Sequence, residues 1–203
     1  MISPKRAVYS TSVTGVSGVF YDTQLKNYVI MWPTEVSMNK QETYQYLTNH
    51  GIRYEVTEHQ AVYNMKELDS VDFLYPECVA KNLFCVDDKK RNYYLITIKG
   101  DKRIELKEFR KQHGLRNLSF ASEDDLMSIM GLLPGSVTPL GLLQDAECRV
   151  HFYLDKEFLG NRIGVHPNDN TATVWMEAND LIQLIKAHGN EVTMVELENV
   201  ILR

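Results

Sequence analysis

The sequence lacks long apolar runs and has few cysteines. No apolar stretch approaches the roughly 18–20 residues needed to cross a bilayer, and the N-terminus lacks the continuous apolar segment of a secretory signal. Its three cysteines, Cys78, Cys85 and Cys148, cannot all pair with one another and form no Cys-x-x-Cys motif. We therefore expect a cytoplasmic protein with reduced thiols and no membrane partner.

The usual catalytic signatures are also missing. The chain has no Gly-x-Ser-x-Gly elbow, no Walker loop, no dinucleotide-binding Gly-x-Gly-x-x-Gly and no His-Glu-x-x-His helix. Its six histidines are scattered, without metal-ligand spacing. The sequence therefore predicts neither a metal nor a cofactor, and only a reaction that needs little chemical assistance.

What is present suits one folded domain of the α+β class. The 203 residues are 44% hydrophobic and 10% aromatic, which is enough for a sizeable core. Capping and periodicity predict helices over 39–50, 65–71, 107–113, 122–130 and 179–188, and strands over 52–56, 78–86, 93–98, 148–154, 163–165, 171–175 and 192–197. Because no βαβ repeat is visible, we predict a single domain with a mixed, largely antiparallel sheet flanked by helices.

The first 37 residues differ from the rest. They are rich in Ser, Thr, Val and Gly and show no helical periodicity. We expect residues 1–37 to be a poorly ordered extension or to add a stray strand, and residues 38–203 to form the domain.

Charge is distributed unevenly. The formal net charge is −5, but residues 81–116 hold eleven Lys or Arg against five acids, so this segment is +6 and the remainder −11. Such a segment can attract a phosphate backbone while the rest of the molecule repels it, although a solvated surface has the same composition. Three of these bases, Lys89, Lys90 and Arg91, fall on the turn of a predicted hairpin.

Three further features can form one site. Lys81 interrupts an apolar strand and points either to solvent or to an anion in a cleft. The segment Gly135-Ser-Val-Thr-Pro139 is either an ordinary connection or a loop whose N–H groups hold an oxyanion. His166, fixed by Pro167, is either an unpartnered surface histidine or a site residue at a defined turn.

Together these blocks resemble a known family. Lys81-Asn-Leu-Phe84, Leu118-Ser-Phe-Ala-Ser122, Gly135-Ser-Val-Thr-Pro139 and His166-Pro167 are similar, in this order, to the freestanding prolyl-tRNA synthetase editing domains of the YbaK/ProX superfamily, and most similar to its alanyl-tRNA(Pro) deacylase branch. The resemblance implies a trans-editing enzyme that hydrolyses the ester of Ala-tRNA(Pro) and needs no cofactor. It implies the tRNA acceptor end and prolyl-tRNA synthetase as partners, and no DNA.

The resemblance also implies roles for individual residues. Lys81 would bind the phosphate or terminal adenosine of the tRNA, the Gly135 N–H would hold the ester carbonyl or water, and His166 would border the aminoacyl pocket. The pocket wall would be formed by Ser136, Val137, Thr138 and Pro139. Separately from the resemblance, the basic charge of Lys89, Lys90 and Arg91 suggests that the hairpin tip contacts the acceptor stem. Two alternatives stay open, namely a deacylase for Cys-tRNA(Pro) or another small aminoacyl-tRNA, and a non-enzymatic tRNA-binding regulator of proline metabolism.

Overall fold

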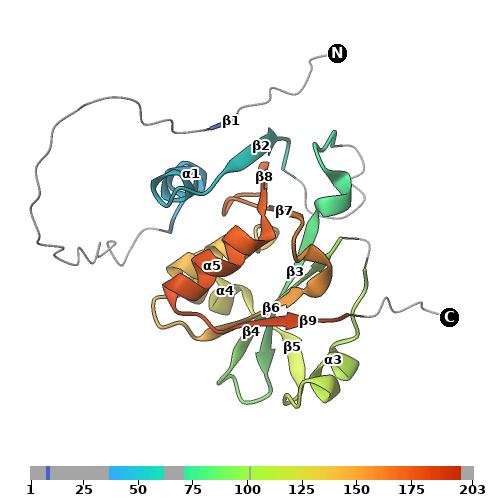
Figure 1. Cartoon of the computed structure of the whole chain (residues 1–203). Helices are drawn as coiled ribbons and strands as arrows, with labels where there is room; N and C mark the ends of the chain where they lie inside the picture. The colour runs from blue at the N-terminus through green and yellow to red at the C-terminus, as the bar shows by residue number, and fades with distance from the viewer. Residues whose placement is uncertain (1–7, 10–36, 62–70, 101, 198–203) are drawn as a thin grey trace, which may run out of the picture.

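The computed structural model describes residues 8–9, 37–61, 71–100 and 102–197, and its strands form two sheets (Figure 1). An antiparallel sheet has the order β1-β2-β8-β7, with bounds Val8–Tyr9, Tyr54–Glu58, Ala172–Glu177 and Arg162–Val165. A five-stranded sheet has the order β5-β3-β4-β6-β9, with bounds Leu118–Phe120, Ala80–Asp87, Tyr93–Lys99, Val150–Asp155 and Val192–Val195. In it β3 is antiparallel to β4 and β5, whereas β6 is parallel to β4 and β9.

The described helices lie within one residue of their predicted bounds. They are α1 (Lys40–Asn49), α3 (Leu106–Gln112), α4 (Glu123–Met130) and α5 (Ala178–His188), with 3-10 turns η1 (Pro76–Cys78), η2 (Pro139–Gln144) and η3 (Lys156–Phe158). Capping boxes form at two of the predicted helix starts, one from Asn39 to Glu42 and one from Ser122 to Asp125. The α+β class with helices around largely antiparallel strands is therefore confirmed.

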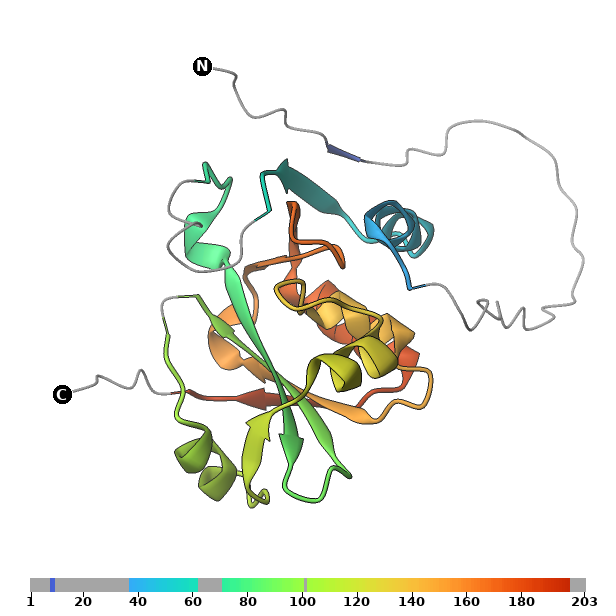
Figure 2. The same cartoon turned by 180° about the vertical axis from the view of Figure 1, so that it is seen from behind.

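The two faces of the five-stranded sheet are covered by different helices. Phe84 and Val86 of β3 pack into the main core with residues of α4 and α5, whereas Cys85, one position out of phase, packs into a smaller cluster with Phe109 of α3. Figure 2 shows α4 and α5 together on one side of this sheet, with α3 near its end. The alternation of side chains along β3 thus decides which cluster each residue reaches.

Several predicted boundaries move. The strand predicted from Cys78 begins at Ala80, because Pro76 opens a 3-10 turn that includes Cys78. Strand β2 begins at Tyr54 rather than Ile52, and the short strand β5 was not predicted. The helix predicted over 65–71 falls almost wholly outside the described residues, as does most of segment 1–37, of which Val8–Tyr9 forms β1.

The two sheets meet where β3 begins. An isolated parallel bridge joins Val79 to Gly164 of β7. Gly164 lies directly opposite Trp175 of β8, and a Cβ at residue 164 would come within 2.3 Å of the Trp175 ring. Because Trp175 is fully buried, its indole occupies the space that only a glycine leaves open.

Among the described helices, none has the length and apolar character of a membrane span.

Candidate functional site

The Gly/Pro loop after α4 opens with a tight turn. Ser136 N donates to Leu133 O at 3.1 Å, and Gly135 has φ +88°. Pro134 at the second position and a left-handed glycine at the third are the signature of a type II turn. Gly135 is exposed, and its N–H has no hydrogen-bond partner among the described residues. A main-chain donor is therefore presented at the surface by a conformation that favours glycine.

The loop is fastened to β3 by Asn82. The Asn82 Nδ2 donates to Val137 O at 3.0 Å, and Thr97 on β4 donates its hydroxyl to Asn82 Oδ1 at 2.7 Å. Asn82 was part of the block that carried the family resemblance, but the sequence analysis assigned it no role. An amide in an otherwise apolar strand, with a threonine on the next strand to orient it, was the available signal.

The same loop is fastened to the histidine turn by Thr138. The buried Thr138 hydroxyl donates to His166 O at 2.7 Å, and Pro139 then starts the buried turn η2. Segment 135–139 and His166, predicted from separate parts of the sequence, therefore lie side by side.

The His166 ring has a defined tautomer. Its Nδ1 lies 3.0 Å from Ala172 O, and because a carbonyl only accepts, Nδ1 carries the proton and Nε2 keeps its lone pair. Burial lowers the pKa of His166 from 6.5, and the nearby His59 lowers it further, against the opposite effects of the Ala172 hydrogen bond and Asp169. His166 is thus a neutral acceptor at neutral pH, and Nε2 has no partner within the ranges that the structure describes.

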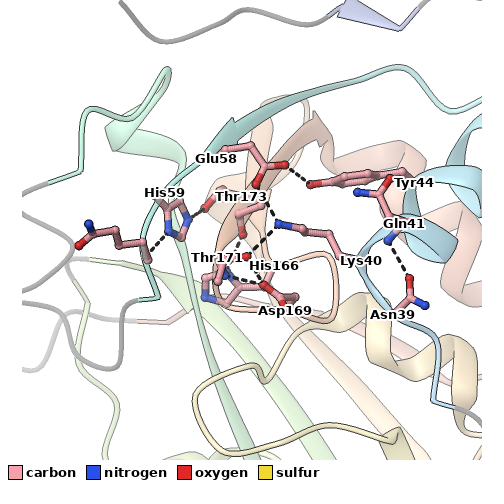
Figure 3. A network of polar contacts seen from close by, with 12 residues as sticks. Asn39, Lys40, Gln41, Tyr44, Glu58, His59, His166, Asp169, Thr171 and Thr173 are labelled. Atoms are coloured by element: carbon pink, nitrogen blue, oxygen red, sulfur yellow. Dashed lines mark hydrogen bonds and ion pairs between the residues drawn. The ribbon is translucent and has the colours of Figure 1, made fainter. Parts of the chain in front are cut away.

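A second histidine stands beside the first. The His59 ring centroid is 6.2 Å from that of His166, and its Nε2 lies 3.0 Å from Thr173 Oγ1 (Figure 3). Phe73 packs edge-on against His59 at 5.7 Å between ring centroids. The sequence analysis counted His59 among scattered histidines, since no local pattern links it to a partner 114 residues away.

Lys81 is next to Asn82 but its ammonium lies on the other face of the sheet. It is paired with Ile98, a member of the smaller cluster, and its Nζ donates to Lys102 O and, at 3.5 Å, to Gly100 O. The structure therefore brings the Lys81 backbone to the site without directing its charge toward His166.

The basic hairpin tip is exposed and its backbone is fixed from within. Asp87 Oδ1 accepts from Lys89 N at 3.0 Å and from Arg91 N at 2.9 Å, and Lys90 has φ +52°. All three basic side chains face solvent. The tip starts six residues beyond Asn82, which is about 20 Å along an extended strand.

Metal-ligand clusters are absent from the described residues, and Cys78, Cys85 and Cys148 are free thiols. The groups gathered near His166 are main-chain donors of the loop, the neutral imidazole and the hydroxyls of Thr138 and Thr173.

The chain is similar to known proteins of tRNA editing. Residues 59–184 match the model of the aminoacyl-tRNA editing domain. The chain is 40% identical over 147 residues to the prolyl-tRNA editing protein ProX of Acetoanaerobium sticklandii, which covers 72% of this chain and 90% of that protein. It is 33% identical over 153 residues to the mouse prolyl-tRNA synthetase associated domain-containing protein 1, covering 73% and 90%.

A solved structure described as a candidate trans-editing enzyme for prolyl tRNA synthetase shares the fold, with a TM-score of 0.57 at 19% identity over 81% of this chain and 100% of that one. The matched segment contains the loop at Gly135 and the turn at His166. The chain belongs to the aminoacyl-tRNA editing domain family, within the YbaK/ProX superfamily.

Proposed function

We propose that this protein removes alanine from mischarged Ala-tRNA(Pro) by hydrolysing the ester bond. The family to which the chain belongs makes it an aminoacyl-tRNA deacylase. The observation that most supports the site is the pair of hydrogen bonds that ties loop 135–139 to Asn82 on one side and to His166 on the other.

The proposed reaction needs little assistance. A water attacks the ester carbonyl carbon, the bond from that carbon to the ribose oxygen breaks, and the ribose oxygen takes a proton. The Gly135 N–H is suited to hold the carbonyl oxygen as negative charge develops on it. Neutral His166 can accept a hydrogen bond at Nε2 from a ribose hydroxyl or the substrate ammonium, but in this tautomer it cannot donate to the carbonyl.

The wall of the loop supports selection by size. Ser136, Thr138 and Pro139 are buried and Val137 is half-buried against the main core, so the wall cannot easily move to admit a larger group. A pocket that just accepts alanine excludes the larger proline ring. The synthetase cannot exclude alanine in the same way, because alanine is smaller than proline and fits the proline pocket.

Purified protein is expected to release labelled alanine from Ala-tRNA(Pro) at least about tenfold faster than proline from Pro-tRNA(Pro). The measurement is single-turnover release of each amino acid, with Cys-tRNA(Pro) as a third substrate. Equal release of proline and alanine would refute the size filter. Faster release from Cys-tRNA(Pro) would move the assignment to the cysteine branch, and binding without release would favour the regulator.

We also propose that phosphates of the acceptor end meet two sets of cations. The exposed bases Lys89, Lys90 and Arg91 would contact the acceptor stem. Lys81 would turn its ammonium from the main-chain oxygens of Gly100 and Lys102 toward a phosphate or the terminal adenosine. The name of the mouse relative supports prolyl-tRNA synthetase as a further partner.

Salt dependence of tRNA binding tests both sets. Alanine at Lys89, Lys90 and Arg91 together is expected to reduce the slope of log K against log salt by about two to three units, and Lys81→Ala by about one. Lys186→Ala, on the exposed face of α5, is the control and should leave the slope unchanged. An unaltered slope for Lys81→Ala would make that lysine a structural support for the main chain at Gly100 and Lys102.

A further inference from the structure

The turn that carries His166 is held from outside by the start of α1. Asn168 Nδ2 donates to Met38 O at 3.0 Å. Two residues on, Lys40 Nζ donates to Thr171 Oγ1 at 2.8 Å and forms an ion pair with Glu58 at 2.9 Å. Figure 3 shows Lys40, Glu58, Thr171 and Asp169 gathered beside His166. Residues 38–40 thus contact both halves of the turn.

Within the turn, Thr171 also contacts Asp169. The Thr171 hydroxyl and, at 2.8 Å, its N–H both contact Asp169 Oδ1. Asp169 is the carboxylate whose charge raises the pKa of His166. Burial raises the pKa of Asp169 itself, whereas the two hydrogen bonds from Thr171 and the charge of Lys40 lower it below its usual range. Ala172, which holds His166 Nδ1, follows Thr171 directly. A displacement of Thr171 therefore acts on the histidine through both the carboxylate and the carbonyl.

The position of Lys40 is unfavourable for the helix alone. It is the first residue of α1, where the positive end of the helix dipole disfavours a cation. The side chain is nonetheless ordered between β2 and the turn, only 23% exposed. Glu58, which pairs with it, is also bound by the Tyr44 hydroxyl at 3.2 Å. The capping box at Asn39 fixes where α1 starts and hence where this ammonium lies.

We propose that Lys40 is a positioning residue for His166, acting through Thr171 and Asp169. This inference rests on the proposed function, since it concerns the same histidine. It assigns part of the editing site to α1, which precedes the segment 59–184 matched by the family model.

The test is Lys40→Met, which keeps the aliphatic stem and removes the charge. The titratable groups that act on His166 are Asp169 on its own turn and His59, which follows β2, and Lys40 with its partner Glu58 lies beyond Thr171 and Asp169. Without Lys40 the Asp169 carboxylate loses a compensating cation and acts more strongly on the imidazole, so the pKa of His166 measured by NMR titration should rise. The acid limb of the pH–rate profile should shift the same way, and kcat should fall about tenfold with a smaller change in KM.

Lys40→Arg should restore much of the parent pKa and rate, and Lys186→Met on α5 should match the parent in both. A Lys40→Met variant with the parent titration of His166 would overturn the proposal, whatever its stability. So would failure of Lys40→Arg to recover either quantity. If the parent releases no amino acid, the deacylase proposal fails, but the NMR titration still decides whether Lys40 positions His166.

Discussion

His166→Ala is expected to lower kcat/KM for deacylation by about 100-fold, which is the usual contribution of one positioned acid–base or hydrogen-bonding group. The variant removes the Nε2 acceptor but keeps the hydrogen bond from Thr138, because that bond ends on the His166 main-chain oxygen. The loop at 135–139 should therefore stay in place, and the loss should report the imidazole itself.

The pH profile of the parent provides a second measurement of the same group. Since the pKa of His166 lies below 6.5, the neutral form persists as pH falls through 6.5, and the rate should decline only at lower pH. His50→Ala, at the exposed end of α1, is the matched control and should keep the parent rate. A His166→Ala enzyme with the parent rate would remove the histidine from the reaction.

Gly164→Ala is expected to reduce the free energy of unfolding by about 3 kcal/mol, at the upper end of what overpacking costs. A methyl at this position would lie 2.3 Å from the Trp175 ring. The ring cannot easily yield, because its Nε1 donates to Thr57 Oγ1 at 2.8 Å and Phe73 and Tyr75 each pack edge-on against it at 5.6 Å between centroids. Urea denaturation measures the effect.

Gly160→Ala separates the clash from backbone strain. Gly160 has φ +72° and open space around its missing Cβ, so alanine there should cost about 1 kcal/mol through the left-handed conformation alone. Equal losses for the two variants would contradict the packing explanation at Gly164.

Local signals in the sequence predicted much of the fold. The capping boxes at Asn39 and Ser122 placed two helices to within a residue, since the bonds that define these caps are made within four residues. The glycine and proline at the ends of segment 135–139 indicated a loop, and a type II turn at Pro134-Gly135 opens it.

The site was predicted less completely because its contacts join distant segments. The direction of the Lys81 side chain depends on which face of the sheet the odd-numbered residues of β3 occupy. Because β3 has apolar residues on both faces, the sequence does not indicate which face this is. The pairing of β2 with β8 likewise brings His59 close to His166. The contact of α1 with the turn before β8 brings Lys40 to Thr171.

In the hairpin between β3 and β4, different residues determine the backbone conformation and the surface charge. A single carboxylate, Asp87, sets the course of the main chain there, so the three cations beyond it are not needed to form the turn. Their number and sign can change with little effect on folding. If the tip contacts the acceptor stem as proposed, its attraction for RNA can accordingly be strengthened or weakened while the proposed site near Asn82, about 20 Å away along β3, retains its geometry.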